Sequence, residues 1–194
     1  MTVLVILAAG ESTRLGFPKQ TLLYKGKTLI EIAVEAGVKS KCDRVIVVLG
    51  ANAEKISPYV SGNSVQVITN PCWKEGIASS IRLAVEFIEP DKNITDTIFM
   101  LCDQPFVNRF LIDSLIYKRQ ETGHKITACT YSNTVGVPAL FSRSLFPQLL
   151  SLKGQDGAKR IITDYTDDIA TVPFEKGRFD IDTIADYEEL LRSL

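Results

Sequence analysis

The chain has 194 residues, with 22 basic and 23 acidic side chains and a formal net charge of −1 at pH 7. This length is most simply one domain over residues 1–194, and the even charge balance gives no support for a nucleic-acid partner. No apolar run approaches the ~18 residues of a membrane span. The N-terminus also lacks the charged region of a signal peptide. We therefore expect a cytoplasmic protein that binds neither membranes nor nucleic acid.

Thiols and imidazoles are too few and too scattered to suggest a zinc site. Cys42, Cys72, Cys102 and Cys129 are widely spaced without a CxxC pair, and His124 is the single histidine. Zinc sites usually show paired cysteines or histidines at short spacing. The sequence therefore predicts four free thiols and places His124 in a surface turn.

Short β-branched runs alternate with amphipathic stretches along the chain. In chain order, the predicted strands are Val3–Leu7, Arg44–Leu49, Val65–Thr69, Thr97–Cys102, Ile126–Tyr131, Val137–Phe141 and Ile169–Pro173. The predicted helices are Thr28–Val38, Glu54–Val60, Ile77–Ile88, Arg109–Thr122, Ser144–Leu152, Gly157–Asp164 and Thr183–Leu194. This alternation is typical of an α/β fold whose mostly parallel sheet is covered by helices on both faces.

The first predicted strand runs into a loop that carries Gly10, Arg14, Gly16 and Lys19. Backbone N–H groups of such a loop can approach a phosphate closely, and the two cations add positive charge. Five residues separate the glycines and no Lys-Ser/Thr pair follows, so this is not the loop of P-loop NTPases. It also lacks the GxGxxG pattern of dinucleotide-binding proteins. We therefore predict a phosphate site of another kind.

Carboxylates follow two later strands. Asp103 comes after the fourth predicted strand, and Asp180 and Asp182 come after the last one. Open parallel sheets bind ligands at the carboxyl ends of their strands, and Mg²⁺ needs only one or two carboxylates besides phosphate and water. These positions suit a Mg²⁺ ion that holds a nucleoside triphosphate. The alternatives are that Asp103 belongs to a turn or caps a helix and that Asp182 or Thr183 caps the last helix, which would leave Asp180 as the second ligand.

A third segment, around Gly76, opens the predicted helix Ile77–Ile88. Glycine and the hydroxyls of Ser79 and Ser80 at a helix N-terminus can offer N–H and O–H groups to a ribose or a base. The alternative is that the serines only stabilise the first helical turn, with Trp73 anchored in the core. Gly76 and Ser80 are the candidates for nucleotide binding in this segment.

These segments together resemble one family. The first loop, LAAGESTRLGFPK, resembles the LAAGxSxRxGxxK signature of nucleotidyltransferases of the molybdopterin cytidylyltransferase and guanylyltransferase type, the MobA-like NTP transferase superfamily. CDQP at Asp103 resembles the metal aspartate of that family, DIDTIADY its DIDTxxDY motif, and NPCWKEGIASS its nucleotide-binding NPxWxxGixxS stretch. GVPALF and LKGQDGAK are similar to its acceptor-facing GxPxlF and LxGDxGAR stretches. In the latter, Gln155 replaces the usual Asp and Lys159 the usual Arg.

The resemblance implies a Rossmann-like three-layer α/β/α sandwich of the nucleotide-diphospho-sugar transferase type. It also implies transfer of a nucleoside monophosphate from an NTP to a phosphate-bearing acceptor such as molybdopterin, with Mg²⁺ as cofactor. The implied nucleotide-binding residues are Leu7, Ala8, Ala9, Gly10, Gly16, Gly76 and Ser80. The implied catalytic residues are Arg14, Lys19 and Asp103, and the implied metal ligands are Asp103 and Asp182.

The first four loop residues also favour one base. Leu7-Ala8-Ala9-Gly10 is like the cytidylyl branch, whereas the guanylyl branch usually reads LAGG, so CTP is the expected substrate. The Ala9 methyl group would narrow the cleft against a purine. Because the acceptor phosphate is already ionised, the reaction needs no general base. Alternatives are a sugar- or alditol-phosphate nucleotidyltransferase, and a non-catalytic nucleotide-binding cofactor carrier for a molybdoenzyme client.

Overall fold

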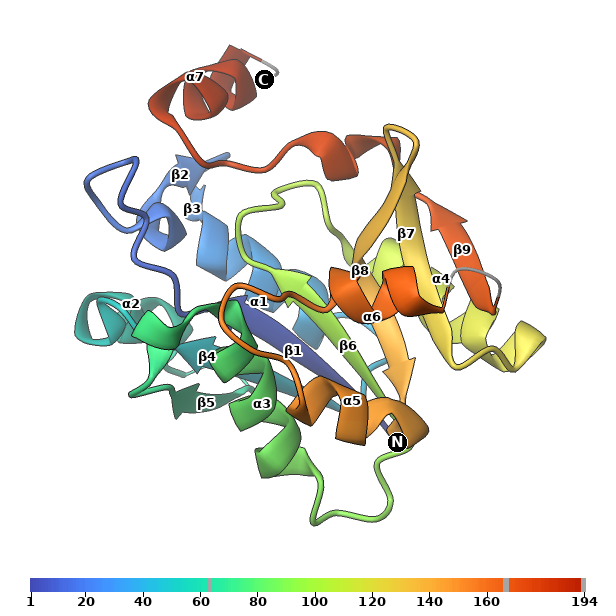
Figure 1. The fold of residues 1–194 in the computed structure, drawn as a ribbon. Helices are drawn as coiled ribbons and strands as arrows, with labels where there is room; N and C mark the ends of the chain where they lie inside the picture. Colours follow the sequence, from blue (N-terminus) through green and yellow to red (C-terminus); the bar gives the residue numbers. More distant parts are fainter. Residues whose placement is uncertain (63, 166–167, 193–194) are drawn as a thin grey trace.

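The computed structural model describes residues 1–62, 64–165 and 168–192. Within them, seven strands form one central sheet in the order β5-β4-β1-β6-β8-β7-β9 (Figure 1). Their bounds are β1 (Thr2–Ala8), β4 (Arg44–Leu49), β5 (Gln66–Thr69), β6 (Asp96–Leu101), β7 (Ile126–Tyr131), β8 (Thr134–Ser142) and β9 (Ile169–Pro173). Only β8 runs antiparallel to its neighbours β6 and β7. The predicted, mostly parallel sheet is confirmed.

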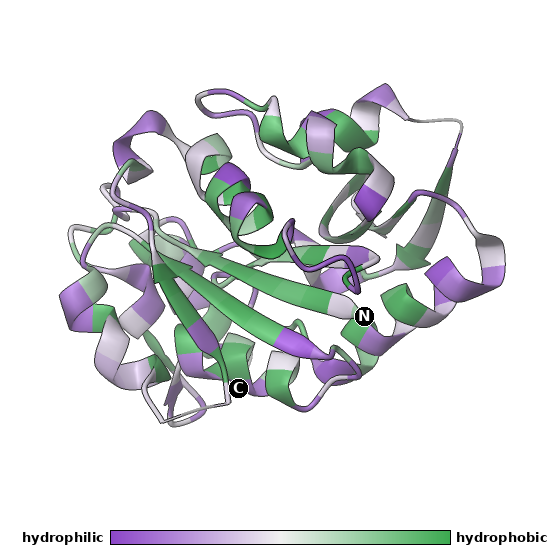
Figure 2. Ribbon diagram, turned by 90° about the horizontal axis from the view of Figure 1, so that it is seen from below, coloured by the Kyte–Doolittle hydropathy of each residue, from purple (hydrophilic) through white to green (hydrophobic). Residues whose placement is uncertain are grey.

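Helices cover both faces of this sheet. On one face lie α1 (Leu29–Val38), α2 (Ala53–Val60) and α4 (Arg109–Thr122), and on the other α3 (Ile77–Ile88), α5 (Phe146–Leu150) and α6 (Lys159–Asp164). Alternate β1 residues serve the two cores: Val3, Val5 and Leu7 face α3, while Leu4 and Ile6 face α1. Figure 2 shows the apolar strands between these helical layers. The three-layer α/β/α architecture follows from this two-sided burial.

A small third core joins the segment after β1 to the C-terminal segment. The hairpin of β2 (Leu23–Tyr24) and β3 (Lys27–Thr28) turns through Lys25 and Gly26, both with positive φ. Helix α7 (Ile184–Arg192) packs near it (Figure 1), and the Tyr187 hydroxyl donates to the Leu23 carbonyl over 2.8 Å. The buried residues of this core are Leu15, Leu22, Tyr24, Leu29, Ile181 and Leu190. The hairpin escaped prediction because its two-residue strands are too short for an alternating pattern.

Helix boundaries differ from prediction where a local signal was stronger than periodicity. The structure forms a 3₁₀ turn at Arg143–Leu145, and α5 begins only at Phe146, ahead of Pro147, a residue favoured in the first helical turn. Further 3₁₀ turns are Lys19–Thr21, Trp73–Glu75 and Glu175–Arg178. The predicted last helix extends to 193–194, which lie outside the described residues.

All four cysteines are free thiols, as predicted. No helix among the described residues is long and apolar enough to cross a membrane.

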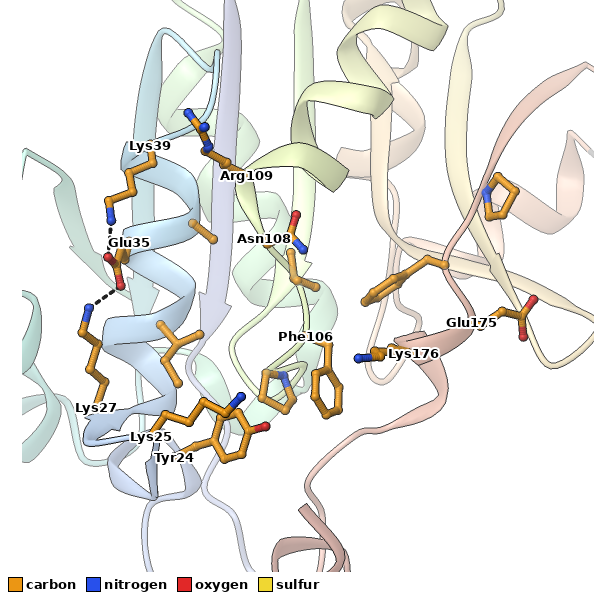
Figure 3. Close-up of a pocket in the computed structure, with 16 residues that line it drawn as sticks. Tyr24, Lys25, Lys27, Glu35, Lys39, Phe106, Asn108, Arg109, Glu175 and Lys176 are labelled. Atoms are coloured by element: carbon orange, nitrogen blue, oxygen red, sulfur yellow. Dashed lines mark hydrogen bonds and ion pairs between the residues drawn. The ribbon is translucent and has the colours of Figure 1, made fainter. Parts of the chain in front are cut away.

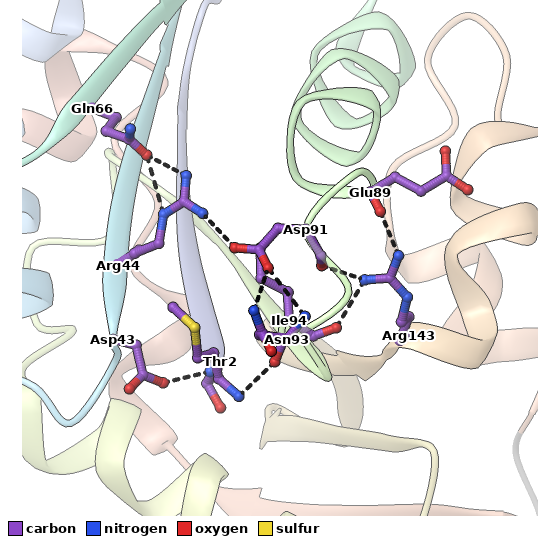
Figure 4. Close-up of polar contacts among 10 residues, drawn as sticks. Thr2, Asp43, Arg44, Gln66, Glu89, Asp91, Asn93, Ile94 and Arg143 are labelled. Carbon is purple, nitrogen blue, oxygen red and sulfur yellow. Dashed lines mark hydrogen bonds and ion pairs between the residues drawn. The ribbon is translucent and has the colours of Figure 1, made fainter.

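Two arginines form hydrogen bonds and an ion pair at the amino ends of the parallel strands (Figure 4). Arg44 donates to the Gln66 side chain over 2.7 Å and pairs with Asp91 over 3.3 Å. Arg143 donates to the carbonyls of Asp91 and Ile94 over 2.8 and 2.9 Å. This edge of the sheet is therefore closed by structural contacts, and the opposite edge holds the site described next.

Candidate active site

A cleft of about 860 Å³ lies at the carboxyl ends of β1 and β6. Its lining is residues 7–14, Lys19, Gln20, Trp73, Lys74, Gly76, Ile77, Ser80, residues 101–103, Gln155, Asp180 and Asp182. Every candidate site residue from the sequence belongs to this lining except Gly16. The segments are far apart in the chain, and the parallel strands bring them to one place.

The loop after β1 is shaped by a residue that the sequence analysis missed. Gln20 is buried, and its side-chain amide donates to the carbonyls of Ala8 and Gly10 over 2.8 and 3.1 Å. Gly16 donates its N–H to the Ser12 carbonyl over 3.3 Å, so it shapes the loop from outside the cleft. The backbone N–H groups of residues 10–14 donate to no described residue. They are free to bind an anion, as the phosphate-site prediction requires.

Four charged groups converge at the mouth of this loop. Lys19 Nζ contacts the carboxylate of Asp103 and lies 2.9 Å from Asp182 Oδ1. Burial disfavours the charge on Lys19, but the Asp103 carboxylate outweighs that cost and raises the pKa of Lys19 above its ordinary value. Arg14 is exposed and reaches Asp182 Oδ2 over 3.3 Å. The candidate catalytic cations and candidate metal ligands thus form one ion-pair network.

In the structure, neither Asp103 nor Asp182 caps a helix through its side chain. Thr183 caps α7: its hydroxyl accepts from Asp186 N–H over 3.2 Å, and the Asp186 carboxylate accepts from Thr183 N–H over 2.7 Å. Asn108 accepts from Leu111 N–H over 3.1 Å and caps α4. Neither helix uses the carboxylate of Asp103 or Asp182, so both carboxylates remain available to the cleft.

The carboxylates differ in their surroundings. Asp103 Oδ1 is buried and has no hydrogen-bond partner among the described residues. Although part of Asp180 faces solvent, desolvation of its carboxylate and the nearby charge of Asp103 raise its pKa to about 6. No group of three or more His, Cys, Asp or Glu side chains that could hold a metal occurs among the described residues. A two-carboxylate site of this kind suits Mg²⁺, which takes its other ligands from phosphate and water.

The third candidate segment is fixed by close backbone packing. Gly76 has φ of 101°, and a Cβ at this position would overlap the carbonyl of Gly154. That carbonyl accepts the N–H of Ala78 over 3.2 Å, so the loop at 152–157 rests on the start of α3 and brings Gln155 to the cleft. The sequence identified Gly76 but gave no sign of this contact, because the two segments are distant in the chain.

Ser80 is oriented by another residue that the sequence analysis missed as an individual. Asn70 is buried, and its side-chain amide donates to the hydroxyls of Ser79 and Ser80 over 2.8 and 2.9 Å. Its carbonyl oxygen accepts the N–H of Cys72 over 2.9 Å. Ser79 donates onward to the Gly76 carbonyl over 2.7 Å. The Ser79 hydroxyl is therefore structural, while Ser80 lines the cleft.

A cationic loop with free N–H groups thus faces paired carboxylates at the carboxyl ends of the parallel strands, where open α/β sheets bind their ligands. The chain belongs to the family of the MobA-like NTP transferase domain, whose model matches residues 4–169. The predicted family and the Rossmann-like fold are confirmed.

Relatives extend along the whole chain. Nicotine blue oxidoreductase of Paenarthrobacter nicotinovorans is 29% identical over 198 residues, covering 96% of this chain and 95% of that protein. The crystal structure of Rv0371C in complex with manganese, from Mycobacterium tuberculosis H37Rv, is 29% identical with a TM-score of 0.79, covering 100% of this chain and 99% of that one. Molybdenum cofactor cytidylyltransferase of Escherichia coli K12 is 26% identical over 88 residues, 45% of each chain. These names cover different reactions, so they do not identify the substrate of this chain.

Proposed function

We propose that this nucleotidyltransferase moves CMP from CTP to a phosphate-bearing acceptor of the molybdopterin type, with Mg²⁺ as cofactor. The observation that carries the proposal is the network of Lys19, Asp103 and Asp182 beside the free N–H groups of residues 10–14. It combines an anion site with oxygen ligands for a divalent cation. The match to the family supports the nucleotidyltransferase class. The choice of CTP as donor and of molybdopterin as acceptor is our proposal.

In this proposal the residues act by position and charge. The N–H groups of residues 10–14 bind the β- and γ-phosphates, and Arg14 and Lys19 offset the charge that develops on pyrophosphate. An ionised oxygen of the acceptor phosphate attacks the α-phosphorus in line, and the bond to the β-phosphate oxygen breaks. Because the attacking oxygen carries no proton, no side chain needs to act as a base.

Asp103 and Asp182 are the residues that would hold the metal. The partnerless, buried Oδ1 of Asp103 fits a cation ligand, since an orphaned buried oxygen is costly unless something binds it. Bound there, Mg²⁺ would neutralise phosphate charge. The manganese in the Rv0371C structure supports a divalent metal in this family.

The proposed preference for CTP rests on the Ala9 methyl group, which would leave less room for a purine than glycine would. The Ala9 backbone carbonyl accepts the N–H of Ala51 over 3.0 Å, and its Cβ lies beside Gly50, where a further Cβ would stand 2.8 Å away. One side of the methyl group is therefore packed, and only the side that lines the cleft could restrict the base. One methyl is worth about 1–3 kcal/mol in a pocket, so we expect a preference of roughly tens-fold.

Pyrophosphate release from equal CTP and GTP, with molybdopterin and with a sugar phosphate as separate acceptors, tests the proposal. We expect CTP with molybdopterin to react fastest and Ala9→Gly to relax the choice of base. Faster reaction with GTP would refute the base, and faster reaction with the sugar phosphate would refute the acceptor. Nucleotide binding without turnover on any acceptor would favour a non-catalytic carrier for a molybdoenzyme client.

A further inference from the structure

A second cavity of about 860 Å³ lies apart from the cleft, between α1, the β2–β3 turn and the start of the 3₁₀ turn at Glu175–Arg178 (Figure 3). No residue belongs to both linings. The chain passes directly from one to the other after β6, because residues 101–103 line the cleft and residues 105–109 line the cavity. The proposed reaction makes no use of this cavity.

Its lining is strongly basic for a protein with a net charge of −1. Basic side chains outnumber acidic ones by three: the bases are Lys25, Lys27, Lys39, Arg109 and Lys176, and the acids are Glu35 and Glu175. Lys27 and Lys39 both pair with Glu35. The other three cations form no ion pair with any described residue. Uncompensated charges of one sign in a concave site attract counter-ions.

Each of these three cations lies over an aromatic ring. Lys25 Nζ is 5.2 Å from the Tyr24 ring centre, and Lys176 Nζ is 4.8 Å from that of Phe106. The Arg109 guanidinium is 4.4 Å from the Phe110 ring centre. Such contacts hold a cation in place without neutralising it. The Tyr24 and Phe106 rings also meet edge to face with their centres 6.1 Å apart, so the cavity has an aromatic wall beside its charges.

We propose that this cavity binds a small molecule that carries both a planar ring and a phosphate group. The ring packs against Phe106 and Phe174, and the phosphate is bound by Lys25 and Lys176, which lie at the same end of the cavity (Figure 3). Both rings are half-buried and line the cavity. Aromatic rings in a cavity pack against flat rings, while unpaired cations bind phosphate oxygens through charge-assisted hydrogen bonds. This second site is independent of the proposed transfer reaction, because none of its residues takes part in that reaction.

The test uses 4-methylumbelliferyl phosphate, a fluorescent ring with one phosphate, and measures its anisotropy on titration with the folded protein. In Lys25→Glu/Lys176→Glu, which changes two exposed lysines of the cavity, we expect binding at least about tenfold weaker than in wild type. Lys55→Glu/Lys92→Glu carries the same charge change at exposed lysines outside both linings and should bind like wild type. Circular dichroism checks that both variants fold.

Three further arms separate this site from the cleft and from simpler ligands. Lys19→Ala, which alters only the cleft, should retain wild-type dye binding, and loss of binding there would assign the dye to the cleft and overturn the proposal. Unchanged affinity in the cavity variant would overturn it too. Equal binding of dephosphorylated 4-methylumbelliferone would show that phosphate plays no part. Inorganic phosphate alone should compete only weakly, because it lacks the ring.

Discussion

Asp103 is the residue whose environment argues most directly for a role in the reaction. Its side chain is 7% exposed, one oxygen contacts Lys19, and the other has no partner among the described residues. We expect Asp103→Asn to lower the rate of pyrophosphate release at least ~10²-fold, because the charge is lost where it would serve the metal. The variant should fold, since the amide has nearly the same shape. Near-normal turnover at saturating Mg²⁺ would exclude Asp103 as a ligand.

Lys19 and Arg14 are both candidate catalytic cations, but their exposures predict different effects. Lys19 is 15% exposed and Arg14 is 70% exposed. Lys19→Ala should lower kcat/KM for CTP by ~10²-fold or more, and it should also reduce the melting temperature because it leaves Asp103 buried and unpaired. Arg14→Ala should lower kcat/KM with an unchanged melting temperature. If the melting temperature of Lys19→Ala stayed at the wild-type value, the ion pair of Lys19 with Asp103 would not contribute to stability.

At the scale of elements, α1 carries a pH-dependent contact on its outer face. Hydrogen bonds from Lys27 and Lys39 lower the pKa of Glu35 from its ordinary value of 4.5 to about 2. A lowered pKa means that this stabilisation is present above pH 4.5 and is lost as the pH falls towards 2. The wild type should therefore have a higher unfolding free energy than Glu35→Gln at pH 6. The difference should be less than about 1 kcal/mol, because the ion pairs of Glu35 with Lys27 and Lys39 are largely exposed.

Urea unfolding of both proteins at pH 6 and at pH 3 checks this expectation. The difference between them should shrink at pH 3, where Glu35 begins to lose its charge. A difference that stays constant between the two pH values would show that Lys27 and Lys39 do not stabilise the carboxylate.

The turn before α3 should tolerate no side chain at Gly76. Its φ is 101°, and a Cβ would meet the Gly154 backbone. Gly123, which ends α4 in the left-handed region with φ of 73° and ψ of −3°, has open space around it, so it is a control without a steric clash. Gly76 has ψ of 179° and also occupies a region that is essentially restricted to glycine. We expect Gly76→Ala to cost about 2–4 kcal/mol in denaturant unfolding and Gly123→Ala about 1–2 kcal/mol. Equal costs would mean that the Gly154 loop moves aside freely.

Periodicity predicted the elements that bury a continuous apolar face. The strand at Arg44–Leu49 is buried along almost its whole length and its bounds are as predicted. The β2–β3 hairpin lacks such a face and depends on contacts with the C-terminal segment, which local sequence does not report. The roles of Gln20, Asn70 and Gly154 likewise depend on hydrogen bonds to other segments, which local sequence patterns do not report.

Motif order predicted the site better than it predicted individual roles. The candidate residues meet in one cleft because parallel strands place their following loops at the same edge. Gly16 illustrates the limit: its N–H donates to the Ser12 carbonyl, and the residue does not line the cleft. Sequence spacing cannot show which backbone groups are already bonded.

Over the whole molecule, charged side chains at the amino ends of the strands have different partners from those at the carboxyl ends. The amino edge is closed by Arg44 and Arg143, whose donors are bound to fixed acceptors. The carboxyl edge carries charges that are paired with one another, and beside it a basic cavity whose charges are partly unpaired. Both the candidate active site and the basic cavity therefore include residues that follow the carboxyl ends of the strands, whereas the amino ends are held by structural contacts.

The ammonium group of Lys19 contacts one carboxylate oxygen of Asp103 and one of Asp182, so a metal ion at these carboxylates would compete with it. A triphosphate in the neighbouring loop would offer that ammonium a new anionic partner. We therefore expect the triphosphate and the metal to favour each other's binding by the same factor. Lys19→Ala should then bind Mn²⁺ alone more tightly than wild type, yet bind CTP with Mg²⁺ less tightly. Calorimetric titration of both ligands shows whether the two affinities move in opposite directions. On this view, Lys19 acts as an exchangeable counter-ion that keeps the carboxylates in place until the substrate arrives.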